Sequence, residues 1–500
     1  MSHGGDGPSD PLVGGEWRLA NARFEHLPVH MALLPTGKVL ALGGSSNNRA
    51  YLRAPHPAEV WDPARDECRT LTQRLPGDIF CAGHAALPNG HLLVAGGTTM
   101  YPPKFLEDRI PLFGGLEHAY TFDPWSETWT RVPNMTRGRW YPTLITLADG
   151  SVLALAGLTR HFPWVVLRKA EQFRPEIGWT RARKAHRWLP LYPRLHLLPD
   201  GRVLYSGSYN THIVFPFSLG RFPTAVLTPG VGWTRIGPPK RREREEGASV
   251  LLPLKAGDAA KVLLIGGGTT GGGVGTNTVE LLDFSRTPLE WRFVAPMRHV
   301  RYYAYAVLLP DGKVLVCGGR TGSHQREEHP MAAEPTHDAG AIYDAEVFDP
   351  EAGTWTTLAA MSVPRLYHSN ALLLPDGRVV MGGSNPKGYY ETRIEVFSPP
   401  YLFQGARPHI TASPPTIAYA GTFDIEVSGP SIDRVVLMRP GVTTHCVDTE
   451  QRHVTLNHRQ TGSSFVVEVP ANRNLLPPGH YMLFVLSDGI PSEAVFVRLA

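Results

Sequence analysis

Short apolar segments recur along most of the chain in pairs, and a polar turn joins the two members of each pair. The second member ends in a glycine pair or a close variant, as in VAGG at 94–97 and VCGG at 316–319. Apolar runs of this length, bounded by Gly, Pro and Asp, predict strands joined by hairpin turns. The pattern therefore predicts an all-β fold.

The strand pairs belong to a larger repeat that also contains an outer phrase such as TFDPWSETWT (121–130) or VFDPEAGTWT (347–356). Seven copies can be aligned at spacings of roughly 50 to 64 residues, in the range of the kelch repeat. Such repeats close around a central channel. We therefore predict a disordered tail over residues 1–15 and a seven-bladed kelch-type β-propeller over residues 16–403.

Residues 404–500 follow a different pattern, in which short strands with alternating polarity come at closer intervals. Examples are TFDIEVSG (422–429), SFVVEVP (464–470) and YMLFVLSDG (481–489). Alternation of this kind, with frequent turn signals, is typical of a β-sandwich. The sequence predicts a small immunoglobulin-like β-sandwich after the propeller.

Composition narrows the classes of partner. The formal net charge is only +4 over 500 residues, and no basic stripe indicates nucleic-acid binding. No apolar run reaches the ~18 residues of a membrane span. The N-terminus has neither the charged nor the apolar region of a signal peptide, so the sequence leaves the compartment open. We expect a monomer that acts on small molecules.

The strand pairs share a register that brings chemically unusual residues together. Nine positions before the glycine of each turn, five of the repeats carry Cys81, Tyr141, Tyr192, Tyr303 and His368. These residues begin the first, innermost strand of their blades, so their side chains are expected to converge at one end of the channel. Aromatic residues that only fill the channel mouth are an alternative reading for Tyr192 and Tyr303.

Tyr367 and His368 are adjacent and offer oxygen and nitrogen ligands, a set that suits Cu(II). A metal site needs a second imidazole, for which His445 is a candidate. His445 lies between two strand-like stretches in a loop rich in Thr and Gly. A lone histidine in a loop is more often simply solvated, so the residues alone leave this choice open.

Four motifs resemble those of the copper radical oxidases, the galactose oxidase and glyoxal oxidase family. They are FCAG (80–83), RWYPT (139–143), RLYHSNALLLPDGRV (365–379) and TTHCVDTEQR (443–452), and the similarity covers nearly the whole chain. The RWYP sequence is closer to the glyoxal oxidase pattern than to that of galactose oxidase.

The resemblance implies a cofactor made from the protein itself. Cys81 and Tyr141 would be joined by a thioether, and the modified tyrosine would hold a radical. Tyr141, Tyr367, His368 and His445 would bind one copper ion, with Tyr367 as axial ligand and proton acceptor. The implied reaction oxidises an aldehyde, as its hydrate, or a primary alcohol with O2 and releases hydrogen peroxide.

Two departures from galactose oxidase bear on the substrate. That enzyme stacks a blade-three tryptophan on the thioether, at a place that falls near Thr159 here, and the candidates to replace it are Trp164, His161 and Trp140. Galactose oxidase also has a glutamine that contacts the sugar, and this chain has Arg320 at the corresponding position. Galactose is therefore not the expected substrate.

Two other functions are compatible with a propeller. A kelch propeller that serves only as an interaction scaffold would not need Cys81, Tyr141, Tyr367, His368 and His445 together. A sialidase-type hydrolase would need Asp-box turns of the form SxDxGxTW, which DPEAGTW (349–355) does not match. The fold alone does not decide between these functions.

Overall fold

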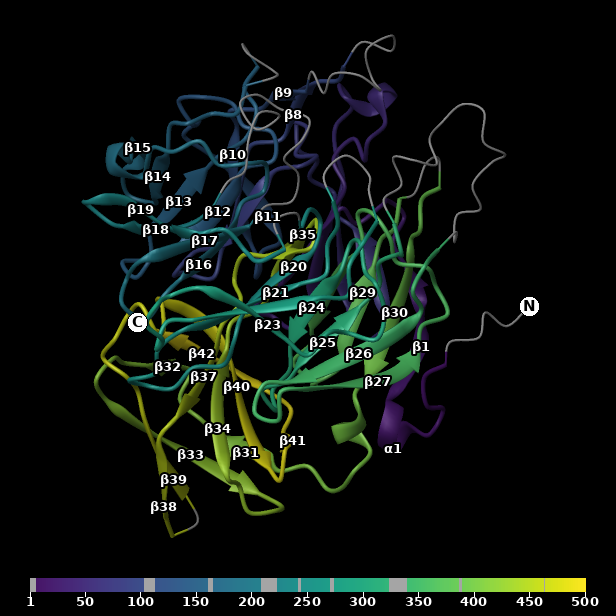
Figure 1. The fold of residues 1–500 in the computed structure, drawn as a ribbon, viewed down its shortest axis with the longest axis vertical. Coiled ribbons are helices and arrows are strands. Elements are labelled where there is room, and N and C mark those ends of the chain that lie inside the picture. Colours follow the sequence, from purple (N-terminus) through teal and green to yellow (C-terminus); the bar gives the residue numbers. More distant parts are fainter. Residues whose placement is uncertain are drawn as a thin grey trace.

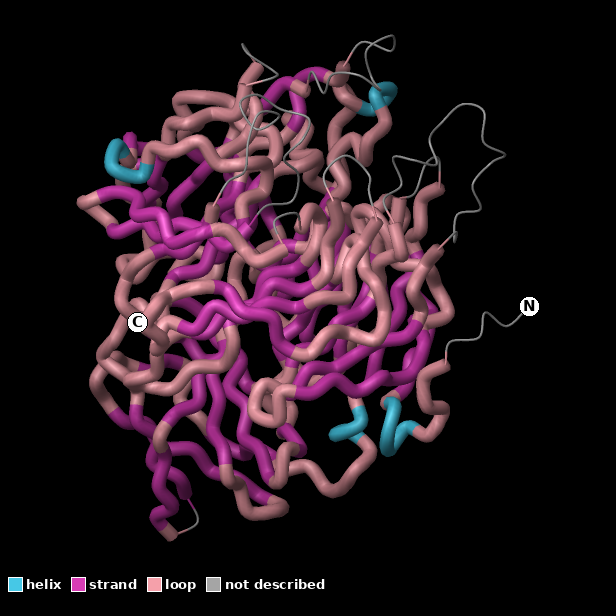
Figure 2. The backbone as a smooth tube through the Cα atoms, viewed as in Figure 1, coloured by secondary structure: helices cyan, strands magenta, loops and turns pink. Residues whose placement is uncertain are grey.

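The computed structural model describes residues 6–102, 113–160, 165–207, 223–241, 244–269, 274–322, 340–385, 389–462 and 464–500. The fold is nearly all-β, as predicted (Figure 2). No helix in these ranges is long and apolar enough to cross a membrane. The helical elements in the described ranges are α1 (Pro11–Gly14), η1 (Arg49–Tyr51), η3 (Arg183–Ala185) and η6 (Pro400–Leu402).

The described strands between residues 16 and 398 form seven antiparallel sheets and a two-stranded ribbon, β8 (Thr98–Met100) with β9 (Gly114–Gly115). The first three sheets in chain order comprise β2 (His30–Leu33), β3 (Val39–Leu42), β4 (Ala58–Asp62) and β5 (Glu67–Thr70); β6 (Gly83–Ala86), β7 (Leu92–Ala95), β10 (Ala119–Asp123) and β11 (Thr128–Val132); and β12 (Thr143–Thr146), β13 (Val152–Leu155), β14 (Glu171–Arg174) and β15 (Gly178–Arg181).

The remaining four sheets repeat this order. They comprise β16 (Arg194–Leu197), β17 (Val203–Gly207), β18 (Thr224–Thr228) and β19 (Gly232–Gly237); β20 (Ala248–Leu251), β21 (Lys261–Ile265), β22 (Val279–Asp283) and β23 (Trp291–Val294); β24 (Tyr305–Leu308), β25 (Val314–Cys317), β26 (Asp344–Asp349) and β27 (Thr354–Ala360); and β28 (Asn370–Leu373), β29 (Val379–Gly382), β30 (Arg393–Ser398) and β1 (Glu16–Arg23).

First strands of successive sheets lie next to one another. β6 contacts β12, β12 contacts β16, β20 contacts β24, and β24 contacts β28, which in turn contacts β2. The last sheet takes its outer strand from the start of the chain, because β1 pairs with β30 through Trp17 and Phe397. The beginning and the end of this region are therefore held in one sheet.

The chain after residue 404 forms two packed sheets, which lie at the lower left of Figure 1. Their shared core includes Phe423, Val435, Phe465 and Leu483. One sheet contains β31 (His409–Ala412), β33 (Thr422–Ser428), β38 (His458–Thr461) and β39 (Ser464–Glu468); the other contains β32 (Thr416–Ile417), β34 (Arg434–Met438), β37 (His453–Leu456), β40 (Gly479–Ser487), β41 (Ile490–Pro491) and β42 (Val495–Leu499).

One hairpin of this C-terminal region leaves its own sheets. β35 (Val442–Thr444) and β36 (Val447–Asp448) join the sheet of β2, where His30 pairs with Thr444. The first N-terminal sheet thereby becomes six-stranded. In Figure 1, β35 lies apart from β34 and β37, and it contacts β28 and β6 as well as β2. The hairpin places His445 beside Cys81, Tyr141 and His368, which lie in the short segments just before β6, β12 and β28 rather than on these strands.

The predicted disordered tail contains an ordered turn. Residues 11–14 form α1, and the Asp10 side chain accepts a hydrogen bond from the Leu12 N–H at its start. An aspartate at this position satisfies a backbone donor that the helix leaves unpaired. We expected ordered structure to begin at residue 16, whereas α1 begins at residue 11.

Candidate metal centre

The five residues at the shared register position (Cys81, Tyr141, Tyr192, Tyr303 and His368, here called the register residues) adopt the same unusual backbone conformation. φ is +63° at Cys81, +61° at Tyr141, Tyr303 and His368, and +42° at Tyr192. A left-handed conformation costs a residue with a Cβ roughly 1–2 kcal/mol. The Tyr141 N–H donates to Cys81 O, and the Tyr192 N–H donates to Tyr141 O, each at 3.0 Å. Neighbouring sheets are thereby joined, and five strained residues lie together where the side chains converge.

Glu246 is a further member of this set, and the register count missed it. Its φ is +57°, and the Tyr303 N–H donates to its carbonyl oxygen at 2.9 Å. The turn between β20 and β21 is longer than the others, so nine positions before Gly257 lies Ala248. The signal that would have found it is Arg244, since an arginine also precedes Tyr141 and Tyr303 by two residues.

Buried arginine and glutamate side chains hold four of these loops in place. Each arginine donates through Nη1 to the carbonyl oxygen of a residue at the end of the second strand of its sheet, at 2.6–2.9 Å. Removing one partner of such a pair typically costs 3–5 kcal/mol, because the other charge stays buried. The pairs are Arg139–Glu171 (2.9 Å), Arg244–Glu280 (2.8 Å), Arg301–Glu346 (2.8 Å) and Arg365–Glu395 (3.8 Å).

The β35–β36 hairpin places His445 beside the register residues. His445 and Cys446 form its two-residue turn, with φ of +49° and +60°. Two positive φ values are typical of a type I′ turn, which usually contains Asn-Gly. The Thr444 hydroxyl donates to Val29 O (3.1 Å) and lies 2.6 Å from His445 Nδ1. A hydroxyl has one proton; when Thr444 donates it to Val29 O, His445 Nδ1 carries the imidazole proton and Nε2 keeps its lone pair.

Imidazole, thiol and phenol groups meet at this point. The possible ligand atoms of Cys81, His368 and His445 all lie within 4.8 Å of one another. The hydroxyl oxygens of Tyr141 and Tyr367 are hydrogen-bonded at 2.8 Å. The Tyr141 and His445 rings lie 4.8 Å apart, and the Tyr367 and His368 rings 3.7 Å apart. The structure thus brings together all five residues that the sequence singled out.

Burial sets the protonation of these groups. Desolvation lowers the pKa of His445 well below its ordinary value, and the neighbouring His368 lowers it further. Desolvation also raises the pKa of the Cys81 thiol and of the Tyr141 phenol. A neutral imidazole is the form that binds a metal. Two imidazoles and two phenols fit Cu(II), which prefers nitrogen and oxygen ligands.

Of the predicted pocket residues, Trp140 lies against the centre. Its ring stacks on Tyr141 at 3.8 Å with an interplanar angle of 15°, and Phe113 stacks on its other side at 4.1 Å. Arg320 is buried, and its backbone pairs with Tyr302, next to Tyr303. Trp164 and His161 lie outside the described residues.

Two buried histidines near the centre were also missed. The Cys81 N–H donates to His30 Nε2 at 3.1 Å, and the His30 and His84 rings lie 4.5 Å apart. His30 and Cys81 are 51 residues apart in the sequence, so no local pattern indicates this contact. His30 fixes the backbone of Cys81, which strengthens the strained conformation described above.

Asp448, at the base of the hairpin, gives a pH-dependent prediction. Its Oδ1 accepts hydrogen bonds from the N–H groups of Val442 and Glu450, and burial raises its pKa to about 7. The folded state holds a proton that the unfolded state, with a pKa of 3.8, has lost, so stability falls as pH rises through this window. We expect Asp448→Asn to gain Tm relative to the wild type between pH 5 and pH 8, by about 1–3 °C.

Differential scanning fluorimetry at several pH values measures this difference. Asp424→Asn, on an exposed position of β33, is the matched control and should show no such trend. A Tm difference between Asp448→Asn and the wild type that stays constant from pH 5 to pH 8 would contradict the prediction.

Both regions of the chain match known protein families. The glyoxal oxidase N-terminus family matches residues 56–401, and the galactose oxidase-like early set domain matches residues 407–499. A fungal alcohol oxidase solved in complex with copper shares the fold, with a TM-score of 0.78 and 23% identity over 97% of this chain and 99% of that one.

Curated relatives show the same similarity. A WSC domain-containing protein of Arthroderma benhamiae is 30% identical over 91% of this chain, and the match spans about half (49%) of that protein. Aldehyde oxidase GLOX of Vitis pseudoreticulata is 28% identical over 84% of this chain and 82% of its own. Galactose oxidase of Gibberella zeae is 27% identical over 95% of this chain and 69% of its own. The chain therefore belongs to the glyoxal oxidase and galactose oxidase family, as its motifs predicted.

Proposed function

We propose that this protein is a copper radical oxidase that oxidises a primary alcohol or an aldehyde hydrate. With O2 as the oxidant, the products are an aldehyde or a carboxylic acid, respectively, and one molecule of hydrogen peroxide. The observation that carries the proposal is the convergence of Cys81, Tyr141, Tyr367, His368 and His445 in one buried cluster. The proposal takes the seven N-terminal sheets as propeller blades and residues 404–500 as an immunoglobulin-like sandwich.

Tyr141, Tyr367, His368 and His445 would hold the copper ion. Copper bound here would supply one of the two oxidising equivalents that the reaction needs, and the Tyr141 radical would supply the other. A thioether from Cys81 to the Tyr141 ring would donate electron density to that ring and ease radical formation. The register supports this bond, because Cys81 and Tyr141 are neighbours joined by a backbone hydrogen bond of 3.0 Å.

The phenols of Tyr367 and Tyr141 would have different roles in oxidising the substrate. Tyr367, in its phenolate form, would accept the proton of the substrate hydroxyl, and its oxygen lies 2.8 Å from that of Tyr141. Tyr141 would take the hydrogen atom from carbon. Trp140, stacked on Tyr141, would shield the radical from solvent. General-base catalysis of this kind contributes typically 10²–10⁴-fold to a rate.

Small aldehydes and primary alcohols are the proposed substrates, and galactose is not. Arg320 stands where galactose oxidase has its sugar-binding glutamine, and the RWYP motif resembles that of glyoxal oxidase. The name of one relative, aldehyde oxidase GLOX, supports aldehyde oxidation. We further propose that the protein acts as a monomer.

Peptide mapping of copper-treated, aerated protein tests the cofactor. Trypsin separates Cys81 from Tyr141, so a joined peptide lighter by two hydrogens than its parts would identify the thioether. The same preparation should release peroxide from an aldehyde or alcohol panel. Copper-saturated protein without the joined peptide and without peroxide would instead support the interaction scaffold.

The Thr444 hydroxyl is expected to strengthen copper binding through its contact with His445. Thr444→Val removes the group that fixes the His445 tautomer, and loss of such a contact to a metal-binding histidine typically weakens affinity 10–100-fold. Competition against a chelator of known affinity measures this change. Thr443→Val, on the same hairpin and with its hydroxyl 3.4 Å from Met31 O, is the matched control. Equal copper affinity in the two variants would refute the role of Thr444.

A further inference from the structure

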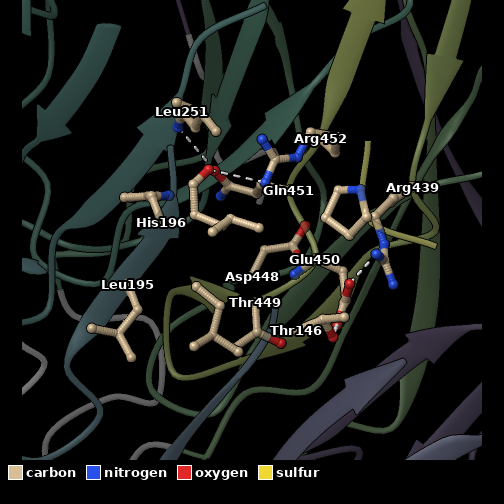
Figure 3. Close-up of a pocket in the computed structure, with 13 residues that line it drawn as sticks. Thr146, Leu195, His196, Leu251, Arg439, Asp448, Thr449, Glu450, Gln451 and Arg452 are labelled. Atoms are coloured by element: carbon tan, nitrogen blue, oxygen red, sulfur yellow. Dashed lines mark hydrogen bonds and ion pairs between the residues drawn. The ribbon is translucent and has the colours of Figure 1, made fainter. Parts of the chain in front are cut away.

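A small polar cavity lies inside the molecule beside the chain segment that follows the hairpin. Its volume is about 20 Å³, enough for one water-sized species. Figure 3 shows it between strands of the N-terminal sheets and residues 448–452. The strands contribute Thr146 and Leu195–Leu197, and the C-terminal region contributes Arg439. The cavity is separate from the five residues of the metal centre.

The Glu450 carboxylate, which lies beside Arg439 in this cavity, already has partners for both of its oxygens. Glu450 Oε2 forms an ion pair with Arg439 Nε at 2.8 Å. Its Oε1 accepts hydrogen bonds from the Ala86 N–H (2.9 Å) and the Thr146 hydroxyl (3.0 Å). Glu450 therefore neutralises Arg439 and has little remaining capacity to accept hydrogen bonds.

Arg452 brings a second positive charge to the cavity. The residue is only 6% exposed, and its Nη2 donates to Leu197 O at 3.0 Å. Its Nε and Nη1 have no hydrogen-bond partner among the described residues. Arg439, Arg452 and Glu450 together carry a net charge of +1, and below about pH 7 Asp448 keeps its proton and does not neutralise it. A buried charge without a counterion is costly, so the cavity favours an anion.

The other polar groups around the cavity do not supply this counterion. Gln451 accepts from the Leu251 N–H and donates to Ser249 O. His196 Nε2 is hydrogen-bonded to the Ser249 hydroxyl at 2.7 Å. Asp448 is the second carboxyl group, and its Oδ1 is taken by two backbone N–H groups. The unpartnered donors that the cavity offers are guanidinium N–H groups.

We propose that this cavity binds a small monovalent anion of the halide class, held by Arg452. The volume excludes sulfate and phosphate, and the net charge of +1 is neutralised by one monovalent anion. The anion would stabilise residues 448–452, which directly follow the β35–β36 hairpin that carries His445. The site is independent of the proposed oxidase reaction.

Bromide in place of chloride tests the site without any variant. Crystals of the copper-loaded wild-type protein grown in sodium bromide should show an anomalous difference peak within hydrogen-bonding distance of Arg452 Nε or Nη1. An ordinary water molecule at that position, with no anomalous signal, would overturn the proposal.

A solution experiment provides the second test. At pH 6, where Asp448 is protonated, replacing sodium methanesulfonate by sodium chloride at constant ionic strength should raise the Tm of the copper-loaded protein by about 2 °C. Arg452→Gln should abolish this rise, whereas Arg459→Gln, at an exposed position of β38, should retain it. An unchanged chloride effect in Arg452→Gln would count against the site. If this variant does not fold, the bromide experiment still decides.

Discussion

Cys81→Ser is expected to abolish the joined peptide and to lower kcat by about 10³-fold or more, because residues that act as one unit lose most of their effect when one is removed. Serine has nearly the same size as cysteine and can occupy the same buried position, where φ is +63°. It cannot form the thioether. A peroxide-coupled assay and peptide mapping of copper-loaded protein measure both effects.

Cys446→Ser is the matched control for this experiment. Cys446 is also buried and also has a positive φ of +60°, yet Tyr305 is its hydrogen-bond partner. The control should keep both the joined peptide and a kcat within a few-fold of the wild type. A Cys81→Ser protein that folds, binds copper and retains a kcat within tenfold of the wild type would rule out the proposed cofactor.

Tyr367→Phe is expected to lower kcat by about 10²–10⁴-fold while leaving the joined peptide intact. The substitution removes the hydroxyl that lies 2.8 Å from the Tyr141 hydroxyl. It keeps the ring that stacks on His368 at 3.7 Å. The loss should therefore come from proton transfer and copper ligation rather than from packing. Steady-state kinetics together with the copper content per chain separate these causes.

Tyr192→Phe serves as the control, since the Tyr192 ring lies 4.5 Å from that of Tyr141 while its hydroxyl donates to Ala82 O. We expect this variant to retain kcat within about tenfold. A similar loss in Tyr192→Phe and Tyr367→Phe would show that the cluster tolerates no change of phenol, and would remove the specific role of Tyr367.

The convergence of the register residues could be predicted because a repeated hairpin places equivalent positions at equivalent heights. Counting positions gave Cys81, Tyr141, Tyr192, Tyr303 and His368, which the structure brings together. Counting nine positions back from the turn glycine did not give Glu246, because the count assumes turns of equal length and the β20–β21 turn is longer. The count also did not predict the positive φ of these residues, since none of them is a glycine and no turn motif indicates this conformation.

His445 shows the limit of local patterns. Its turn lacks the Asn-Gly sequence that marks a type I′ hairpin, so the residues alone suggested an ordinary loop. Its position depends on the pairing of β35 with β2, which are more than 400 residues apart in the sequence. The need for a second imidazole made this histidine a candidate, and the resemblance to a family favoured it. His30 was missed because its contact with Cys81 also joins distant segments of the chain.

The pairing of β2 with β35 also has a consequence for the order of events during synthesis. Ribosomes release the N-terminal sheets long before residue 445 emerges, and pairing between distant segments forms late in folding. A nascent chain already holds Cys81, Tyr141, Tyr367 and His368 but still lacks His445. On the proposed function, the full set of copper ligands would therefore exist only after residue 445 has been synthesised, so copper would bind after the N-terminal sheets have been made.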